Sequence, residues 1–147
     1  MTEKYELVEA LMENTYTLID IYPMTVPKDK RDVYFEVEEY FNQVEERQRF
    51  ADKLIRILLK TACYFDMEIC YEDQWIKEVK RDQLIKIIQD CIVHGRGWAN
   101  ILLTKENTLI QMSSGDLYIP VYNPSERVNQ IVGALVQSEG LFWRTRC

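Results

Sequence analysis

The clearest pattern in the chain is an apolar stripe that starts after Asp32 and continues to Phe65. Its members recur at alternating spacings of four and three residues, which is the period of one face of an α-helix. The stripe comprises Val37, Phe41, Val44, Gln48, Ala51, Ile55, Leu58, Ala62 and Phe65, and it is widened by Tyr34, Tyr40, Phe50, Leu54 and Ile57. It predicts one long amphipathic helix, or two helices broken near residues 42–43, buried within the same chain.

Self-association along this stripe is the alternative, because apolar residues at this spacing also suit a coiled-coil seam. The polar Gln48 and the broad apolar flanks favour packing against a sheet instead. The pattern therefore allows a homodimer but does not predict one.

Shorter patterns predict the remaining elements. Helical spacing and end signals place helices over residues 2–14, 74–93 and 125–140, and alternation places strands over residues 15–22, 98–104, 108–114, 116–122 and 141–145. Gly95 follows the second helix where a left-handed residue often ends one. Pro120 cannot donate a ladder hydrogen bond, so its strand is expected at an edge or a bulge.

These elements predict an α+β fold in a single domain over residues 1–147. The N-terminal part is mostly helical, with its long amphipathic helix (or broken pair) packed on a small, mostly antiparallel sheet. The C-terminal part follows the order β-β-β-α-β. No linker separates two halves of the chain, and 147 residues is a common length for one domain.

Charge is distributed unevenly and excludes some partners. Residues 1–90 carry 20 acidic and 13 basic side chains and residues 91–147 carry 4 and 5, which gives net charges of −7 and +1. Proteins that bind nucleic acid usually present a basic stripe, and this sequence has none. Neither nucleic acid nor a membrane is therefore expected as a partner. The first residues lack the apolar core of a signal peptide, so we expect a cytoplasmic location with free cysteine thiols.

Cys91 and the only histidine, His94, are the candidates for catalysis. Three residues apart, they share a helix face, and a thiolate beside a histidine base can act as a nucleophile. No acidic residue stands out to orient the histidine, so a buried thiol and a polar helix end are the simpler interpretation. The cysteines are too widely spaced for a structural zinc site, and no metal is predicted.

Arg96 and Trp98 are candidates for ligand binding, because the sequence His-Gly-Arg-Gly-Trp places an arginine between two glycines at the junction of a helix and a strand. Glycine lets a backbone approach a ligand, and arginine binds carboxylate or phosphate. The glycine-rich patterns of nucleotide-binding loops are absent. A simple chain reversal is therefore favoured, and no cofactor is predicted.

Acidic and aromatic side chains are the candidates for partner binding. Five glutamates lie on the polar side of the apolar stripe, namely Glu36, Glu38, Glu39, Glu45 and Glu46. The chain also has nine tyrosines, too many for all to be buried with satisfied hydroxyls, so some are expected to line a surface or groove.

Two functions from different classes follow. The first is a non-catalytic interaction protein, such as an inhibitor, an immunity-like protein or an adaptor, that binds another protein through its acidic or aromatic surface. The second is a small enzyme or ligand-binding domain with a pocket near His94, Arg96 and Trp98. We favour the first, because sites of chemistry usually gather more polar groups than one histidine and one arginine.

Overall fold

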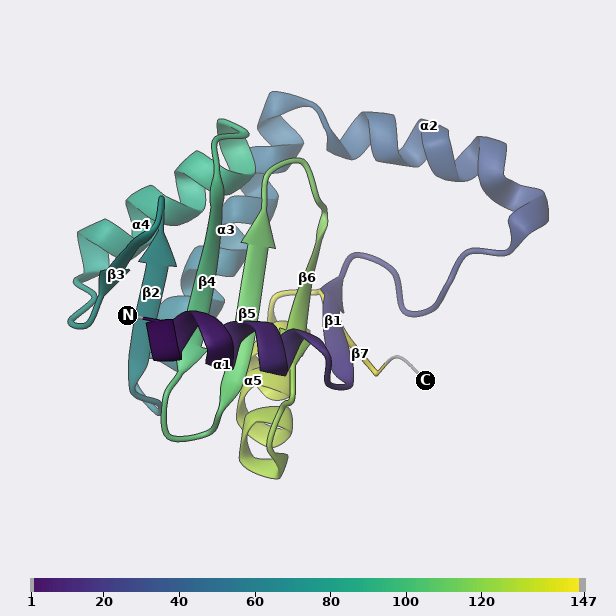
Figure 1. Cartoon of the computed structure of the whole chain (residues 1–147). Coiled ribbons are helices and arrows are strands. Elements are labelled where there is room, and N and C mark those ends of the chain that lie inside the picture. The colour runs from purple at the N-terminus through teal and green to yellow at the C-terminus, as the bar shows by residue number, and fades with distance from the viewer. Residues whose placement is uncertain (1, 146–147) are drawn as a thin grey trace.

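The computed structural model describes residues 2–145 of the chain (Figure 1). Its helices are α1 (Thr2–Met12), α2 (Arg31–Phe41), α3 (Val44–Thr61), α4 (Arg81–Ile88) and α5 (Glu126–Ser138), with a 3₁₀ helix η1 (Lys28–Lys30) and a π-helix η2 (Gln89–Val93). Its strands are β1 (Tyr16–Asp20), β2 (Met67–Tyr71), β3 (Gln74–Ile76), β4 (Trp98–Leu103), β5 (Thr108–Ser113), β6 (Tyr118–Tyr122) and β7 (Phe142–Thr145).

The strands form one antiparallel sheet in the order β3-β2-β4-β5-β6-β1-β7. Strand β1 lies between β6 and β7, so the sheet joins the beginning of the described chain to its end. The predicted α+β class, the broken helix pair and the C-terminal order of three strands, a helix and a strand are all confirmed. Ser125 begins α5 by accepting a hydrogen bond from the backbone N–H of Val128, a common helix cap.

The two faces of the sheet are covered differently. Helices α3, α4 and α5 lie behind the sheet in Figure 1, where Leu54 and Leu58 of α3 join the main core with Ile101 of β4. Helix α1 crosses the opposite face and packs Val8 into a smaller cluster with Leu102. Above α1 in this view, parts of β6 and β1 are open (Figure 1).

The predicted helix over residues 74–93 begins too early. Strands β2 and β3 form a hairpin in this region, and α4 starts only at Arg81. The turn residues Glu72 and Asp73 have positive φ angles of 50° and 62°, as two-residue hairpin turns require. Because glycine or asparagine normally marks such a turn, this hairpin has little signal in the sequence. Trp75 consequently lies in a strand, where its ring contacts Tyr5 of α1 edge to face.

Pro120 lies in an inner strand, so of the two positions predicted for it, an edge or a bulge, the edge is wrong. Strand β6 pairs with β1 along its whole length but with β5 only at Leu109–Tyr122 and Ile110–Val121. Pro120 comes just past those two pairs. Its missing N–H therefore removes no bond from the ladder with β5.

Burial of the apolar stripe is confirmed for α3, whereas in α2 no residue is fully buried and only Phe41, at its end, packs against the main core. Helix α3 buries seven residues, whereas α2 buries none. The two helices meet at Asn42 and Gln43, and Gln43 has an extended backbone with φ −66° and ψ 147°. This bend directs α2 away from the sheet (Figure 1).

Candidate functional site

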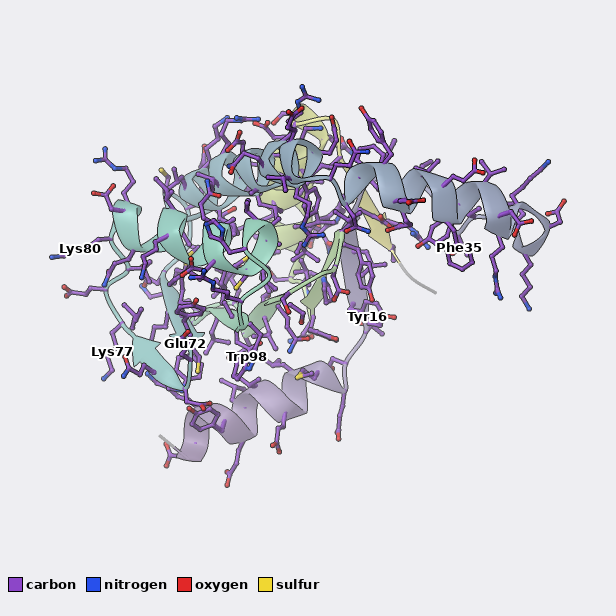
Figure 2. All side chains as sticks on the ribbon, turned by 90° about the horizontal axis from the view of Figure 1, so that it is seen from above. Tyr16, Phe35, Glu72, Lys77, Lys80 and Trp98 are labelled. Carbon is purple, nitrogen blue, oxygen red and sulfur yellow. The ribbon has the colours of Figure 1, made fainter. Side chains whose placement is uncertain are left out.

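Helix α2 extends beyond the body of the protein, and Figure 2 shows Phe35 on its outer part. The exposed fractions of Val33, Phe35 and Tyr40 are 56%, 57% and 50%. Single exposed apolar residues are common on protein surfaces, but several on one short helix are typical of an interaction surface.

Val33, Val37 and Tyr40 lie on one face of α2, spaced by four and three residues. We call this row the α2 seam. Side chains at this spacing pack into a facing helix or groove. Val44, 72% exposed at the first position of α3, adds apolar surface beyond the bend. The α2 seam thus has the pattern of a packing surface, although no residue of α2 is fully buried within the described chain.

The five candidate glutamates divide into two groups. Glu36, Glu39 and Glu45 are exposed, and within residues 2–145 no hydrogen bond or ion pair engages them. Glu46 accepts a hydrogen bond from the Tyr40 hydroxyl at 3.1 Å and pairs with Arg49. Glu38 accepts one from the hydroxyl of Tyr34. The first group is free to meet a partner, and the second stabilises the local structure.

A buried arginine fixes the base of α2. Arg47 is only 8% exposed, and its Nε donates to the carbonyl of Ile92 in η2 at 2.7 Å. Its Nη1 donates to the side-chain oxygen of Asn42, the residue that ends α2. These bonds tie the bend between α2 and α3 to η2. Sequence reasoning missed Arg47, because a charged residue in an amphipathic helix normally faces solvent.

A groove of about 610 Å³ lies between α2, the segment that precedes it and the open part of the sheet. Five of the nine tyrosines line it, namely Tyr16, Tyr22, Tyr34, Tyr118 and Tyr122. Two pairs are in contact, Tyr16 with Tyr122 at 5.4 Å and Tyr22 with Tyr34 at 5.6 Å between ring centroids. Figure 2 labels Tyr16, which marks the start of β1. We call this feature the tyrosine groove.

The lining of the tyrosine groove includes a nearly buried ion pair between Asp20 and Arg144. Asp20 also accepts the backbone N–H of Ile21 at 2.7 Å, and Arg144 donates to the hydroxyl of Thr25 at 2.6 Å. The pair thereby connects β7 to the segment that forms one wall of the groove. Asp20 and Arg144 are 124 residues apart, and nothing in the local sequence indicates that they meet.

Two tyrosine hydroxyls in the groove differ in their partners. Burial, together with the hydrogen bond that its hydroxyl donates to Glu38, raises the pKa of Tyr34 to about 12. The hydroxyl oxygen of Tyr22 is shut off from water, and it has no hydrogen-bond partner in the described part of the chain. A buried hydroxyl without a partner is unfavourable in the free protein.

The residues predicted for catalysis and ligand binding lie outside the tyrosine groove. Cys91 is fully buried, and burial raises the pKa of its thiol to about 12, so the thiol is protonated at neutral pH. His94 and Arg96 are exposed, and Trp98 is 38% exposed. None of the four lines the tyrosine groove or the second cavity described next. Of the remaining cysteines, Cys63 is exposed and Cys70 is buried, and Cys147 lies outside the described residues.

A second cavity, of about 530 Å³, lies at the junction of α3, β2 and α4. Lys77 and Lys80 line it at the opposite end of the molecule from Phe35 (Figure 2). Its carboxylates, Asp66 and Glu68, are paired with Lys105 and Lys4. The carboxylates of this cavity already have partners, whereas the tyrosine groove includes a hydroxyl without one among the described residues, that of Tyr22.

Gly95 ends the helical region with φ 61°, as the sequence predicts, and the chain then enters β4. Over residues 2–145, no helix is long and apolar enough to cross a membrane, and no three histidine, cysteine or acidic side chains gather as metal ligands. Comparisons with known protein families, with curated proteins and with solved structures find no match to this chain.

Proposed function

We propose that this protein is a non-catalytic interaction module that binds another protein through α2. The observation that carries the proposal is the α2 seam, a helical row of apolar side chains in a helix that buries none of its residues. Burial of such apolar surface against a partner lowers the free energy of the complex, because the surface is removed from water. Tyr40 suits such a surface, because an aromatic ring with a polar tip tolerates water when no partner is bound.

The charge on α2 indicates which charged side chains the binding surface of the partner should carry. Helix α2 carries four acidic side chains and one basic one, a net charge of −3. Glu36 and Glu39 are exposed and unpaired within the described residues. We therefore expect the partner to present an apolar patch flanked by lysine or arginine. A basic enzyme that this protein inhibits, or a basic protein that it links as an adaptor, would present such a patch.

The same charge disfavours a second copy of the chain as the partner. Two α2 seams in contact would bring two helices of charge −3 side by side. Like charges across an interface oppose association. A basic partner faces no such repulsion, and its encounter is accelerated by attraction instead.

A small enzyme with a site at Cys91 and His94, or a ligand pocket near Arg96 and Trp98, has less support. The Cys91 thiol is protonated at neutral pH because burial raises its pKa to about 12, whereas the thiolate is the reactive form. The other three residues are exposed and line neither cavity.

The test first isolates the partner and then measures its association rate. The immobilised wild-type protein captures interacting proteins from a lysate of the source cells. The captured protein is then purified, and its rate of association with the immobilised wild-type protein or variant is measured at low and at physiological salt. Glu36→Lys with Glu39→Lys should slow association about tenfold and flatten its salt dependence, because charges within about 10 Å steer encounter.

The matched control reverses two exposed glutamates far from α2, by Glu9→Lys in α1 with Glu13→Lys just after its end. The control has the same net charge as the α2 variant, so it separates local steering from overall charge. Unchanged association in the α2 variant, or equal slowing in both variants, would rule out α2 as the docking surface.

A further inference from the structure

The tyrosine groove is separate from the α2 seam. Residues on another side of α2 line it, namely Arg31, Tyr34 and Glu38, whereas Val33 and Val37 do not. Its volume of about 610 Å³ lies within the range of sites that hold small ligands in proteins. The charges and the rings of its lining restrict what can occupy it.

Positive charge without an acidic partner lies at one end of the groove. The lining holds three basic side chains and two acidic ones, a net charge of +1 in a chain whose net charge is −6. Arg144 is paired with Asp20. Lys28 and Arg31 also line the groove, and no ion pair within residues 2–145 engages either of them. An anion at this end would supply the partner that both cations lack.

The acidic residues nearby do not cancel this charge. Asp29 and Asp32 lie close to the two cations in the chain, but neither lines the groove. Glu38 does line it, and its carboxylate accepts a hydrogen bond from the Tyr34 hydroxyl. Glu38 follows Arg31 by two helical turns, which is roughly 10 Å along α2. An anion bound at Arg31 therefore does not have to approach this carboxylate.

Aromatic rings lie beside the unpaired cations. Tyr34 follows Arg31 by three residues and therefore shares its side of α2. On the sheet, Tyr118 lies opposite Asp20, and the partner of Asp20 in its ion pair donates to Thr25 in the segment before α2. Tyr118 is 44% exposed, so a ligand in the groove can reach its ring. This end of the groove thus combines positive charge with aromatic surface.

We propose that the tyrosine groove binds a small aromatic anion, namely a planar ring that carries a carboxylate or a phosphate. The ring packs against Tyr118 and Tyr34, since aromatic rings favour contact with other rings. The anionic group binds Lys28 and Arg31, because lysine and arginine are the side chains that hold carboxylate and phosphate. An uncharged ring leaves both cations without a partner, and a cationic ligand is repelled by them.

Naphthalene compounds substituted at the same ring position are the probes, and isothermal titration calorimetry with the full chain is the measurement. Naphthoate and naphthyl phosphate carry the ring and an anion, and at least one should bind saturably and more weakly as salt rises. The tighter of the two identifies the anionic group. Naphthylmethanol lacks the charge and naphthylmethylamine reverses it, so both should bind at least tenfold more weakly. Acetate, inorganic phosphate and tetraglutamate lack the ring and should not displace the bound anion.

Removal of the two cations tests their role directly. Lys28→Ala with Arg31→Ala should weaken binding of the tighter anion at least tenfold and leave that of naphthylmethanol unchanged. The matched control is Lys30→Ala with Lys86→Ala, which changes the net charge equally at two exposed positions outside the groove. The control should bind as wild type does. Equal weakening in both variants would mean that overall charge, and not the groove, attracts the anion.

The aromatic part of the site is tested at Tyr118. Tyr118→Ala should weaken binding of the anion at least tenfold, whereas Tyr118→Phe keeps the ring and should bind as wild type does. Tyr64→Ala, at a 53% exposed tyrosine outside the groove, should leave binding unchanged. Circular dichroism confirms that the variants fold. Unchanged binding in Tyr118→Ala would place the anion elsewhere and overturn the proposal.

The site does not depend on the α2 seam, and the two proposals can fail separately. Val33→Ser with Tyr40→Ser should leave binding of the anion unchanged, since neither residue lines the groove. Absence of saturable binding of both naphthalene anions at millimolar concentration, or equal affinity for naphthoate and naphthylmethylamine, would overturn the groove proposal and leave the α2 seam to its own test.

Discussion

Helices α2 and α3 follow each other in the chain and carry the same alternating spacing of apolar residues, yet they occupy opposite environments. Helix α3 buries Phe50, Leu54 and Leu58 in the main core. Helix α2 buries no residue, and Val33 and Tyr40 are at least half exposed. Helical period therefore identifies an apolar face, but it does not say what covers that face.

Composition separates the two helices where period does not. Helix α3 carries three acidic and five basic side chains, a net charge of +2, whereas α2 has −3. The apolar side of α3 is rich in leucine and isoleucine, and that of α2 is valine and aromatic. Aromatic residues with polar tips are frequent at binding surfaces, whereas leucine and isoleucine dominate cores. This difference in composition supports the proposal that α2 binds a partner protein.

The largest predicted effect comes from the buried side of this comparison. Leu58→Ala in α3 should lower the free energy of unfolding by about 2–5 kcal/mol, because Leu58 is 1% exposed and its truncation leaves a cavity. Val37→Ala in α2 should cost less than about 1 kcal/mol, because Val37 is only partly buried and lies outside the main core. Chemical denaturation measures both, and equal losses would contradict the uncovered position of α2.

Arg47 should show an intermediate effect, because it connects the two helices. Arg47→Ala should cost about 1–3 kcal/mol, since it leaves the Ile92 carbonyl and the Asn42 side chain without their donor. Hydrogen exchange of the α2 amides should become faster. The control is Arg49→Ala, whose exposed ion pair with Glu46 should contribute little. Lower stability with unchanged exchange in α2 would argue against Arg47 as its anchor.

A smaller effect is expected from the buried thiol of Cys91 in alkaline solution. Burial raises the pKa of this thiol from about 9 to about 12, so the unfolded chain loses the proton first. Between these values the unfolded state binds fewer protons, and stability therefore falls as pH rises. The contribution is roughly 1 kcal/mol at about pH 10. Denaturation at about pH 8 and about pH 10 should show a smaller fall for Cys91→Ala than for wild type, and an equal fall would contradict a buried, protonated thiol.

Much of the fold follows from local sequence. The strands from Trp98 to Tyr122, the helix that Ser125 begins and the left-handed Gly95 all have local signals that the structure confirms. The hairpin of β2 and β3 was not predicted, because Glu72 and Asp73 adopt positive φ without the usual residue types. Position within the sheet, as for Pro120, depends on pairing between distant strands and has no local signal.

The candidate site was less predictable than the fold. An abundance of tyrosine indicates that some rings line a surface, but it does not say which of them meet. The tyrosine groove forms because β1 inserts beside β6, which brings Tyr16 against Tyr122 from more than 100 positions away. Sequence reasoning also placed Glu38 with the free glutamates, whereas it lines the groove and binds Tyr34.

The most direct test of the account combines the smallest expected effect on stability with the largest on binding. Val33→Ser with Tyr40→Ser removes two members of the α2 seam, both at least half exposed. The free energy of unfolding should change by less than about 1 kcal/mol, as surface substitutions do, while the affinity for the purified partner should fall at least tenfold. A large loss of stability would mean that the seam is buried within the chain, and unchanged affinity would mean that the partner binds elsewhere.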